Sequence, residues 1–202
     1  MELLNKGETV VFSDGVSLVR SSDTLTADKM VTDKERDKIH AYGDVCLHRK
    51  MNDGESWKGY GAEGFYDTKP GTGFLLGKGK QAHLIYNQVL SSTETRKIDL
   101  FADRVDFSNP SQIGYAKGNV YGRTVDPGTS DLYEFWSQNA ELDKQKNVII
   151  LSGRVQPLVT QTKGDEKKNI RGDVITYYID SKKFVAEGKS QAVFFNPPKR
   201  RN

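Results

Sequence analysis

The sequence is poor in the residues that define most small catalytic or metal-binding proteins. A single cysteine, Cys46, excludes an internal disulfide and any paired-cysteine metal motif. The three histidines, His40, His48 and His83, fall at different phases of separate apolar stretches, which is typical of surface or packing positions. The sequence contains no Gly-x-Ser-x-Gly elbow and no complete phosphate-binding loop. We therefore predict that the protein is not an enzyme, has no catalytic or metal site and needs no cofactor.

Long hydrophobic runs are also missing. Because no stretch of about 18 apolar residues occurs, the sequence predicts no membrane-spanning helix. Residues Met1–Asn5 lack the basic start and apolar stretch of a signal peptide, which leaves open a cytoplasmic protein or a mature chain. The net charge of +3 is too small to indicate nucleic acid as a partner. With 36% hydrophobic and 28% charged residues, thin layers with one buried face are favoured over a thick core.

What the sequence does contain is an internal repeat. Glycines 15, 43, 79, 118, 153 and 188 recur beside alternating apolar stretches, at intervals of 28, 36, 39, 35 and 35 residues. A small residue stands 16 or 17 positions ahead of each of the last five glycines, namely Ala27, Ala62, Ala102, Ser137 and Gly172. Because no segment resembles a linker, we predict one domain over residues 1–202. Its ordered core would span about 8–196, and residues 197–202 would form a basic tail.

Each repeat has the pattern of two strands joined by a polar turn. Apolar side chains stand two places before the small residue but three and five places after it, so the inward face must change there. This change predicts a bulge or bend at each small residue. Asp28, Asp103 and Asp173 directly follow three of the small residues and could form turn hydrogen bonds or bind a metal; their recurrence favours hydrogen bonding. We predict an all-β, elongated, twisted antiparallel sheet, folded along its length, with its bends stacked in register.

Side chains that follow the bends would form a continuous apolar strip along the stack. The residues alone leave open whether this strip is the packed core of a sandwich or the lining of a groove for lipid chains. Its members are Met30, Val45, Leu47, Phe65, Leu84, Val105, Phe107, Val120, Leu142, Ile175 and Tyr177.

The first and last predicted strands, 9–12 and 192–195, are both apolar. Exposed end strands associate unless they are protected, so we expect end-to-end strand addition or, alternatively, an end covered by the basic tail. The residues expected to carry this assembly are Val10, Val11, Phe12, Ala192, Val193 and Phe194.

Three segments, 25–30, 116–120 and 170–177, resemble the OstA-like (LptA) family of lipopolysaccharide transport proteins. The resemblance extends from about Val10 to Phe195 and is carried by weak motifs repeated at steady spacing, together with a terminal Gly-Asp-x-Ile-Thr-Tyr strand. It implies a twisted β-jellyroll that is open along one side. The groove of such a fold shelters the acyl chains of lipid A while the sugars remain outside.

The same resemblance implies a periplasmic bridge protein that binds lipopolysaccharide between the inner and outer membranes. Its partners would be the inner-membrane LptC-like and outer-membrane LptD-like OstA domains and further copies of itself, joined head to tail. A membrane-anchored LptC-like component, an LptD N-terminal domain, and a structural β-solenoid that assembles without lipid remain as alternatives. The first repeat departs from the pattern, since no small-residue marker precedes Gly15.

Overall fold

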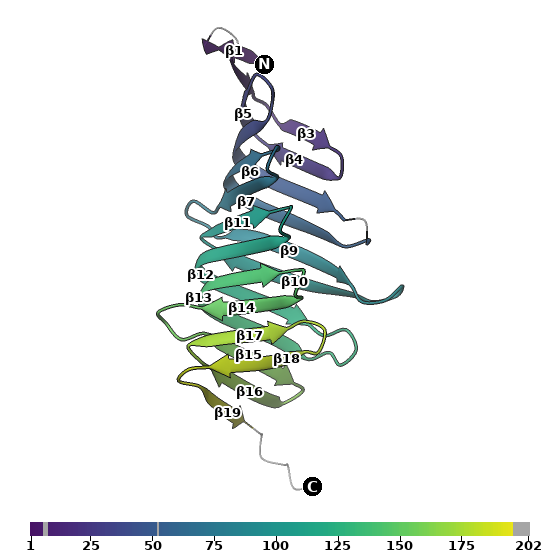
Figure 1. The fold of residues 1–202 in the computed structure, drawn as a ribbon, viewed down its shortest axis with the longest axis vertical. Helices are drawn as coiled ribbons and strands as arrows, with labels where there is room; N and C mark the ends of the chain where they lie inside the picture. The colour runs from purple at the N-terminus through teal and green to yellow at the C-terminus, as the bar shows by residue number, and fades with distance from the viewer. Residues whose placement is uncertain (6–7, 52, 196–202) are drawn as a thin grey trace.

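The structure is a computed structural model that describes residues 1–5, 8–51 and 53–195. Antiparallel pairing joins nineteen strands into one continuous sheet. The strands lie across a long axis, with β1 (Glu2–Leu4) at one end and β19 (Gln191–Phe195) at the other (Figure 1). The predicted elongated, antiparallel all-β fold is confirmed. The predicted basic tail, 197–202, lies outside the described residues, and within them we find no helix capable of crossing a bilayer.

The sheet is folded into two layers that share four long strands, β6 (Lys38–Lys50), β7 (Ser56–Asp67), β12 (Ile113–Val125) and β13 (Leu132–Asp143). The first layer contains one half of each shared strand. Its other strands are β1, β2 (Thr9–Phe12), β5 (Lys29–Asp33), β8 (Thr72–Leu76), β11 (Arg104–Ser108), β14 (Val148–Ser152), β17 (Val174–Tyr178) and β18 (Lys183–Glu187).

The second layer contains the other half of each shared strand. Its remaining strands are β3 (Val16–Arg20), β4 (Asp23–Ala27), β9 (Ala82–Val89), β10 (Thr95–Ala102), β15 (Leu158–Lys163), β16 (Glu166–Arg171) and β19. The two layers are therefore continuous along the bent strands, whereas on the opposite side, where the hairpin turns lie, no described strand passes from one layer to the other. We call that opposite side the seam.

Each pair of shared strands bends where one strand carries an extra residue. In β12, Gly118 and Asn119 stand opposite the single residue Gln138 of β13. Both have positive φ, 75° and 48°, a conformation that glycine and asparagine tolerate better than most residues. Gly43 and Asp44 form the equivalent bulge in β6. Because the bulge redirects the strand from one layer into the other, the predicted bends are confirmed.

The aspartates that follow the small residues form hydrogen bonds at these corners. The amide of Asp103 donates to the carbonyl oxygen of Gly118 at 2.9 Å, and its Oδ2 accepts from Asn119 Nδ2, also at 2.9 Å. In the last repeat, Asp173 Oδ2 accepts from the amide of Lys189 at 3.0 Å. Among the described residues, no group of three or more histidine, cysteine, aspartate or glutamate side chains could hold a metal ion. The contacts thus support the hydrogen-bonding interpretation of the aspartates.

The second repeat lies one residue away from its predicted position. Ala62 is the single residue at the bend of β7, whereas Gly61 still pairs with β6. The counterpart of Ser137 is therefore Gly61, and the glycine sixteen residues later is Gly77, not Gly79. With this shift, all five intervals from small residue to glycine are sixteen residues.

This shift corrects the position of Phe65. Because neighbouring side chains of a strand point to opposite faces, a one-residue slip reverses every assignment. Gly64 and Tyr66 are the buried residues of this segment. Phe65 lies on the outer face, with its ring 4.7 Å from that of His40 and 5.8 Å from that of Phe74. The expectation that Phe65 faces inward is wrong.

The ends of the sheet also differ in part from expectation. β2 lies between β1 and β5, so Val10, Val11 and Phe12 do not form the edge, and that prediction is wrong. Among the described strands, β1 and β3 form the free edges at one end, and β18 and β19 form those at the other. β19 is an end strand as predicted, and Phe194 is 64% exposed.

Candidate functional site

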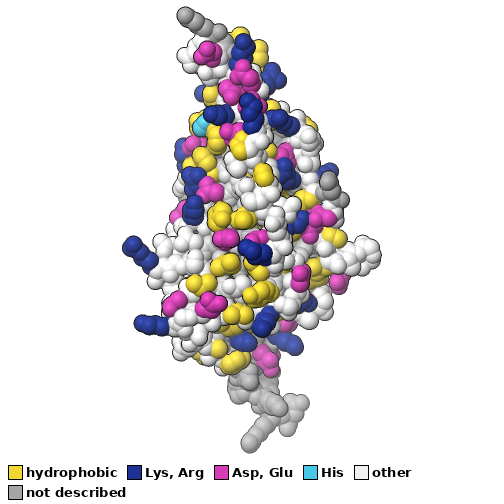
Figure 2. All heavy atoms as spheres, in the orientation of Figure 1, with side chains coloured by type: hydrophobic (Ala, Val, Ile, Leu, Met, Phe, Trp, Pro, Cys, Tyr) yellow, Lys and Arg dark blue, Asp and Glu magenta, His cyan; other side chains and the backbone are white. Residues whose placement is uncertain are grey.

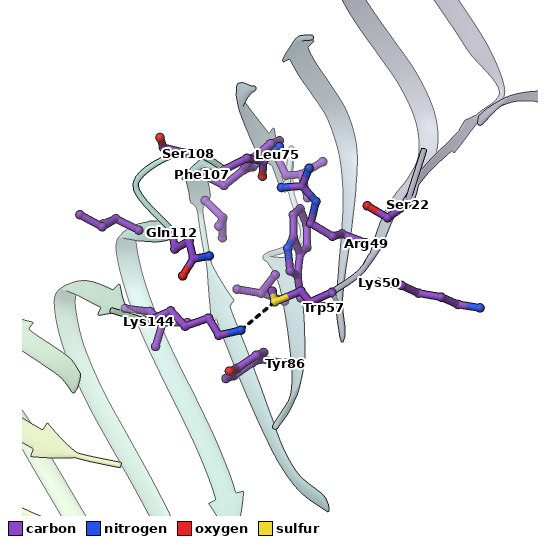
Figure 3. A pocket seen from close by; sticks show the side chains of 17 residues that line it. Ser22, Arg49, Lys50, Trp57, Leu75, Tyr86, Phe107, Ser108, Gln112 and Lys144 are labelled. Atoms are coloured by element: carbon purple, nitrogen blue, oxygen red, sulfur yellow. Dashed lines mark hydrogen bonds between the residues drawn. The ribbon is translucent and has the colours of Figure 1, made fainter. Parts of the chain in front are cut away.

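An apolar cavity of about 280 Å³ lies between the two layers and is open at the seam (Figure 3). Side chains from both layers form its wall, and polar side chains from the hairpin turns form its rim. The wall contains Met51, Trp57, Leu75, Leu84, Tyr86, Val105, Phe107, Ile113, Gly114 and Leu142. The rim contains Ser22, Arg49, Lys50, Ser108, Asn109, Gln112 and Lys144. An apolar wall with a polar rim can bind the hydrocarbon part of an amphiphile and leave its polar part in water.

A smaller space of about 20 Å³ adjoins this cavity. It shares Leu84, Tyr86 and Leu142 with the larger cavity and is also bounded by Phe135 and Ile149. The apolar wall therefore extends toward the core beyond the main cavity.

Glycines on the neighbouring strands leave room for the large side chains of the wall. Phe107 of β11 is directly opposite Gly73 of β8. A Cβ on Gly73 would collide with the Phe107 ring. Gly59 is likewise opposite Leu84, and a Cβ there would collide with Leu75. Gly59 and Gly73 are thus a sequence signal for bulky side chains on the neighbouring strands.

The predicted strip residues divide into three groups. Leu84, Val105, Phe107 and Leu142 line the cavity. Phe65 lies on the outer face, as described above. The remaining members are buried in the closed core between the layers, each no more than 4% exposed: Met30, Val45, Leu47, Val120, Ile175 and Tyr177. The strip is thus partly cavity wall and partly packed core.

Sequence reasoning missed several residues of the wall. Trp57 lies on a segment for which no inward face was predicted, whereas Tyr86 follows Leu84 by two places in β9 and therefore shares its inward face. The ring of Trp57 lies 5.3 Å from that of Phe107 in the opposite layer. Leu75 belongs to the short strand β8, which pairs with the shifted segment of β7. It lies opposite the buried Gly64, so the one-residue slip that misplaced Phe65 also explains why Leu75 was not predicted.

Three polar clusters join the layers across the seam. The first, the Tyr66 clasp, consists of Tyr66, Asp23 and Arg49. Tyr66 Oη donates to Asp23 Oδ2 at 3.0 Å, and Arg49 donates to both oxygens of Asp23 at 2.7 and 3.0 Å. Burial and the nearby Asp23 carboxylate raise the pKa of Tyr66. The phenol therefore remains a hydrogen-bond donor at neutral pH.

The second cluster, the Lys144 clasp, consists of Lys144, Asp53, Glu55 and Met51. Lys144 Nζ from the first layer lies 2.7 Å from Asp53 Oδ2 and 2.7 Å from Glu55 Oε2 in the second layer. It also lies 3.1 Å from the sulfur of Met51, toward which it points in Figure 3. Partial burial alone would lower the pKa of Lys144, but hydrogen bonds to the two carboxylates raise it. Tyr86 Oη donates to Glu55 and holds that carboxylate at the cavity wall.

The third cluster, the Lys182 clasp, consists of Lys182, Asp126, Arg96 and the carbonyl of Ile179. Asp126 Oδ2 lies 2.6 Å from Lys182 Nζ and 3.1 Å from Arg96 Nη2. Arg96 Nη1 donates to the carbonyl oxygen of Ile179 at 2.9 Å. Burial alone would raise the pKa of Asp126, but the contacts with Lys182 and Thr129 lower it to about 2. The cavity lies between the Tyr66 clasp and the Lys144 clasp, which both supply residues to its rim.

On the face shown in Figure 2, neither sign of charge predominates among the described side chains. Basic and acidic side chains are interspersed with apolar ones over the face in Figure 2. On the outer side of the second layer, five rings form a cross-strand row with neighbouring centroids 4.2–5.9 Å apart: Tyr60, His83, Phe101, Tyr121 and Trp136. Such cross-strand aromatic pairs stabilise the sheet.

Comparison with known proteins agrees with this architecture. Residues 1–98 match the family model described as LptA/(LptD N-terminal domain) LPS transport protein. The fold is similar to the crystal structure of LptH, the LptA-homologous periplasmic component of the lipopolysaccharide transport device from Pseudomonas aeruginosa. The TM-score is 0.53 at 12% identity, over 70% of this chain and 95% of LptH. The predicted resemblance to the OstA-like family is confirmed. No curated protein sequence matches.

The wall of the cavity contains residues from inside the region that the family model matches and residues that follow it. Trp57 and Leu84 lie within residues 1–98, whereas Phe107 and Leu142 follow them. The family model therefore covers one part of the cavity wall, and the repeat continues the same architecture through the other.

Proposed function

We propose that this protein binds the lipid A part of lipopolysaccharide. It would shelter an acyl chain in the cavity between its layers while the lipid passes through the periplasm. The observation that carries the proposal is the apolar cavity at the seam, with a polar rim and a wall that includes Leu84, Phe107 and Leu142. The match of residues 1–98 to lipopolysaccharide transport proteins supports the choice of lipid.

The energetics favour such a site. Removing a methylene group from water contributes about 0.8 kcal/mol, so even part of an acyl chain gains several kcal/mol on entering an apolar cavity. The opening at the seam would let the chain enter while the attached sugars and phosphates stay hydrated. A carrier of this kind performs no covalent chemistry and requires only a sheltered apolar surface.

The free strand edges support a bridge built from several OstA-like units. β19 contributes Ala192, Val193 and Phe194 at one end, and β1 and β3 lie at the other. An unpaired edge can accept a strand from another chain through backbone hydrogen bonds. We propose that these edges join copies of this chain head to tail, and join the chain to LptC-like and LptD-like domains.

Site-specific photo-crosslinking tests lipid binding. A photoreactive amino acid at Phe107 should form an adduct with lipopolysaccharide, because this side chain lies in the cavity wall. The matched control is Phe65, which has the same native side chain but lies on the outer face. Equal labelling at both positions, or no labelling at Phe107, would refute the proposed cavity binding.

A scaffold that assembles through its ends without lipid is a second candidate. The closed packing on the C-terminal side favours it, since the rings of Tyr133, Tyr177 and Phe184 fill the space between the layers there, with centroids 4.5–6.1 Å apart. In that case, photo-crosslinking at Phe107 would yield no adduct, while association of the ends would persist.

A further inference from the structure

The cavity is small for a lipid that carries several acyl chains. Sites for drug-sized ligands enclose roughly 300–1,000 Å³, and the volume here, about 280 Å³, falls at the lower end of that range. The two clasps that flank the cavity hold the layers together and so limit its width. A larger occupant must separate the two layers at one of these clasps.

The three clasps differ in their exposure to water. In the Tyr66 clasp, Tyr66 and Asp23 are only 6% and 9% exposed. In the Lys182 clasp, Arg96 and Asp126 are 2% and 1% exposed. In the Lys144 clasp the Asp53 side chain is 51% exposed, but those of Lys144 and Glu55 are 19% and 10% exposed, close to the 22% and 12% of the Arg49 and Asp23 side chains in the Tyr66 clasp.

Exposure does not rank the two clasps at the cavity, because each contains a buried ion pair that is costly to separate. Their places in the fold do. The carboxylate partners of Lys144 lie in the hairpin turn that follows β6, outside the regular part of the sheet, whereas Tyr66, Asp23 and Arg49 lie within β7, β4 and β6. The seam therefore separates most easily at Lys144.

We propose that Lys144 determines the number of acyl chains that the cavity admits: with the clasp closed it takes one chain, and a multi-acyl lipid enters only after the clasp opens. This inference rests on the proposed function, since it concerns selectivity at the same cavity. Lys144 acts here as a specificity-determining residue, because it limits the separation of the layers through Asp53 and Glu55.

The test compares Lys144→Met with Lys146→Met. Lys146 lies in the same turn but pairs with Asp143 of its own layer, so its loss leaves the seam unchanged. Uptake of laurate, with a single chain, and of multi-acyl lipid A is followed by stopped-flow fluorescence of Trp57. For Lys144→Met we expect lipid A uptake to accelerate about fivefold and laurate uptake to change less than about twofold. Lys146→Met should behave like the wild type.

Three outcomes separate the possibilities. Equal lipid A uptake by the wild type and Lys144→Met would overturn the role of Lys144, and so would equal acceleration of both ligands. If neither ligand reached Trp57 in any variant, the proposed function itself would fail.

A covalent lock provides a second test should Lys144→Met fold poorly. Lys144→Cys and Asp53→Cys are combined with Cys46→Ser and joined by a reducible bis-maleimide, which replaces the length of the lysine side chain. The cross-linked protein should exclude lipid A but still bind laurate, and reductive cleavage of the linker should restore lipid A uptake. Uptake of lipid A by the locked protein would overturn the proposal.

Discussion

The side chain of Asp103 lies directly over the Cα of Gly118, in the space that a Cβ at that position would occupy. The same relationship joins Asp28 to Gly43 and Asp173 to Gly188. Each of these glycines has a positive φ, between 70° and 78°. The repeat is therefore a repeated corner, in which an aspartate covers a glycine as the chain passes between layers.

This relationship predicts that Gly118→Ala destabilises the protein by about 2–4 kcal/mol, because alanine adds a collision to an unfavourable φ. Gly114→Ala, in the same strand, should change the free energy of unfolding by less than about 0.5 kcal/mol. Its added Cβ would meet its nearest neighbour at 3.9 Å. Urea denaturation measures both. In an Asp103→Ala background, Gly118→Ala should lower the free energy of unfolding by a smaller amount. An unchanged loss would show that the Asp103 side chain does not collide with the added Cβ.

The Lys182 clasp predicts a specific dependence of stability on pH. The pKa of Asp126 is about 2 in the folded protein, below its ordinary value of 3.8. A lowered folded pKa stabilises the protein above pH 3.8 and loses that contribution as the pH falls through about 2. The stability difference between the wild type and Asp126→Asn should therefore decrease by about 2 kcal/mol from pH 5 to pH 2. A difference that does not vary with pH would contradict the assignment.

The Tyr66 clasp predicts a loss of stability on removal of one hydroxyl group. Tyr66→Phe should lower the free energy of unfolding by about 1–3 kcal/mol, because a buried hydrogen bond to a carboxylate is lost. Tyr178→Phe, at a position that is 42% exposed, should have little effect. Thermal and urea denaturation measure the difference, and equal effects of the two substitutions would argue against a clasp at Tyr66.

The exposed edge strand predicts an effect on assembly. Phe194→Glu should weaken association, because it places a charge on β19, where the native ring is 64% exposed. Val155→Glu, at a position that is 76% exposed outside the strands, is the control. Sedimentation velocity over a range of concentrations measures the effect. Identical association of the wild type and Phe194→Glu would exclude β19 as the contact.

The bends could be predicted from the sequence because each bend requires particular residue types, and these can be recognised by their spacing. In three repeats a corner has a glycine with positive φ, a small residue sixteen positions before it and an aspartate directly after that small residue, and such a combination is visible when it recurs. The face of each strand was harder to predict in the second repeat. Gly61 and Ala62 are both small, and choosing the wrong one reversed Phe65 and Tyr66.

The position of the cavity could not be predicted, because it depends on how one layer lies over the other. Lys144 and Asp53 are 91 residues apart, and no local pattern shows that they meet. The edge strand at the N-terminal end was predicted wrongly for a different reason. Glu2–Leu4 is only three residues long, too short to show alternation, yet it pairs with β2 and removes it from the edge.

The two tryptophans provide the most direct test of acyl-chain binding. Trp57 lines the cavity, whereas Trp136 lies in the aromatic row on the outer face and is 37% exposed. Trp136→Phe leaves only Trp57, and Trp57→Phe leaves only Trp136. Each protein is titrated with lipid A whose acyl chains carry bromine, which quenches indole fluorescence on contact. We predict saturable quenching of Trp57 and none of Trp136. Quenching of Trp136 alone, or of both equally, would contradict binding in the cavity.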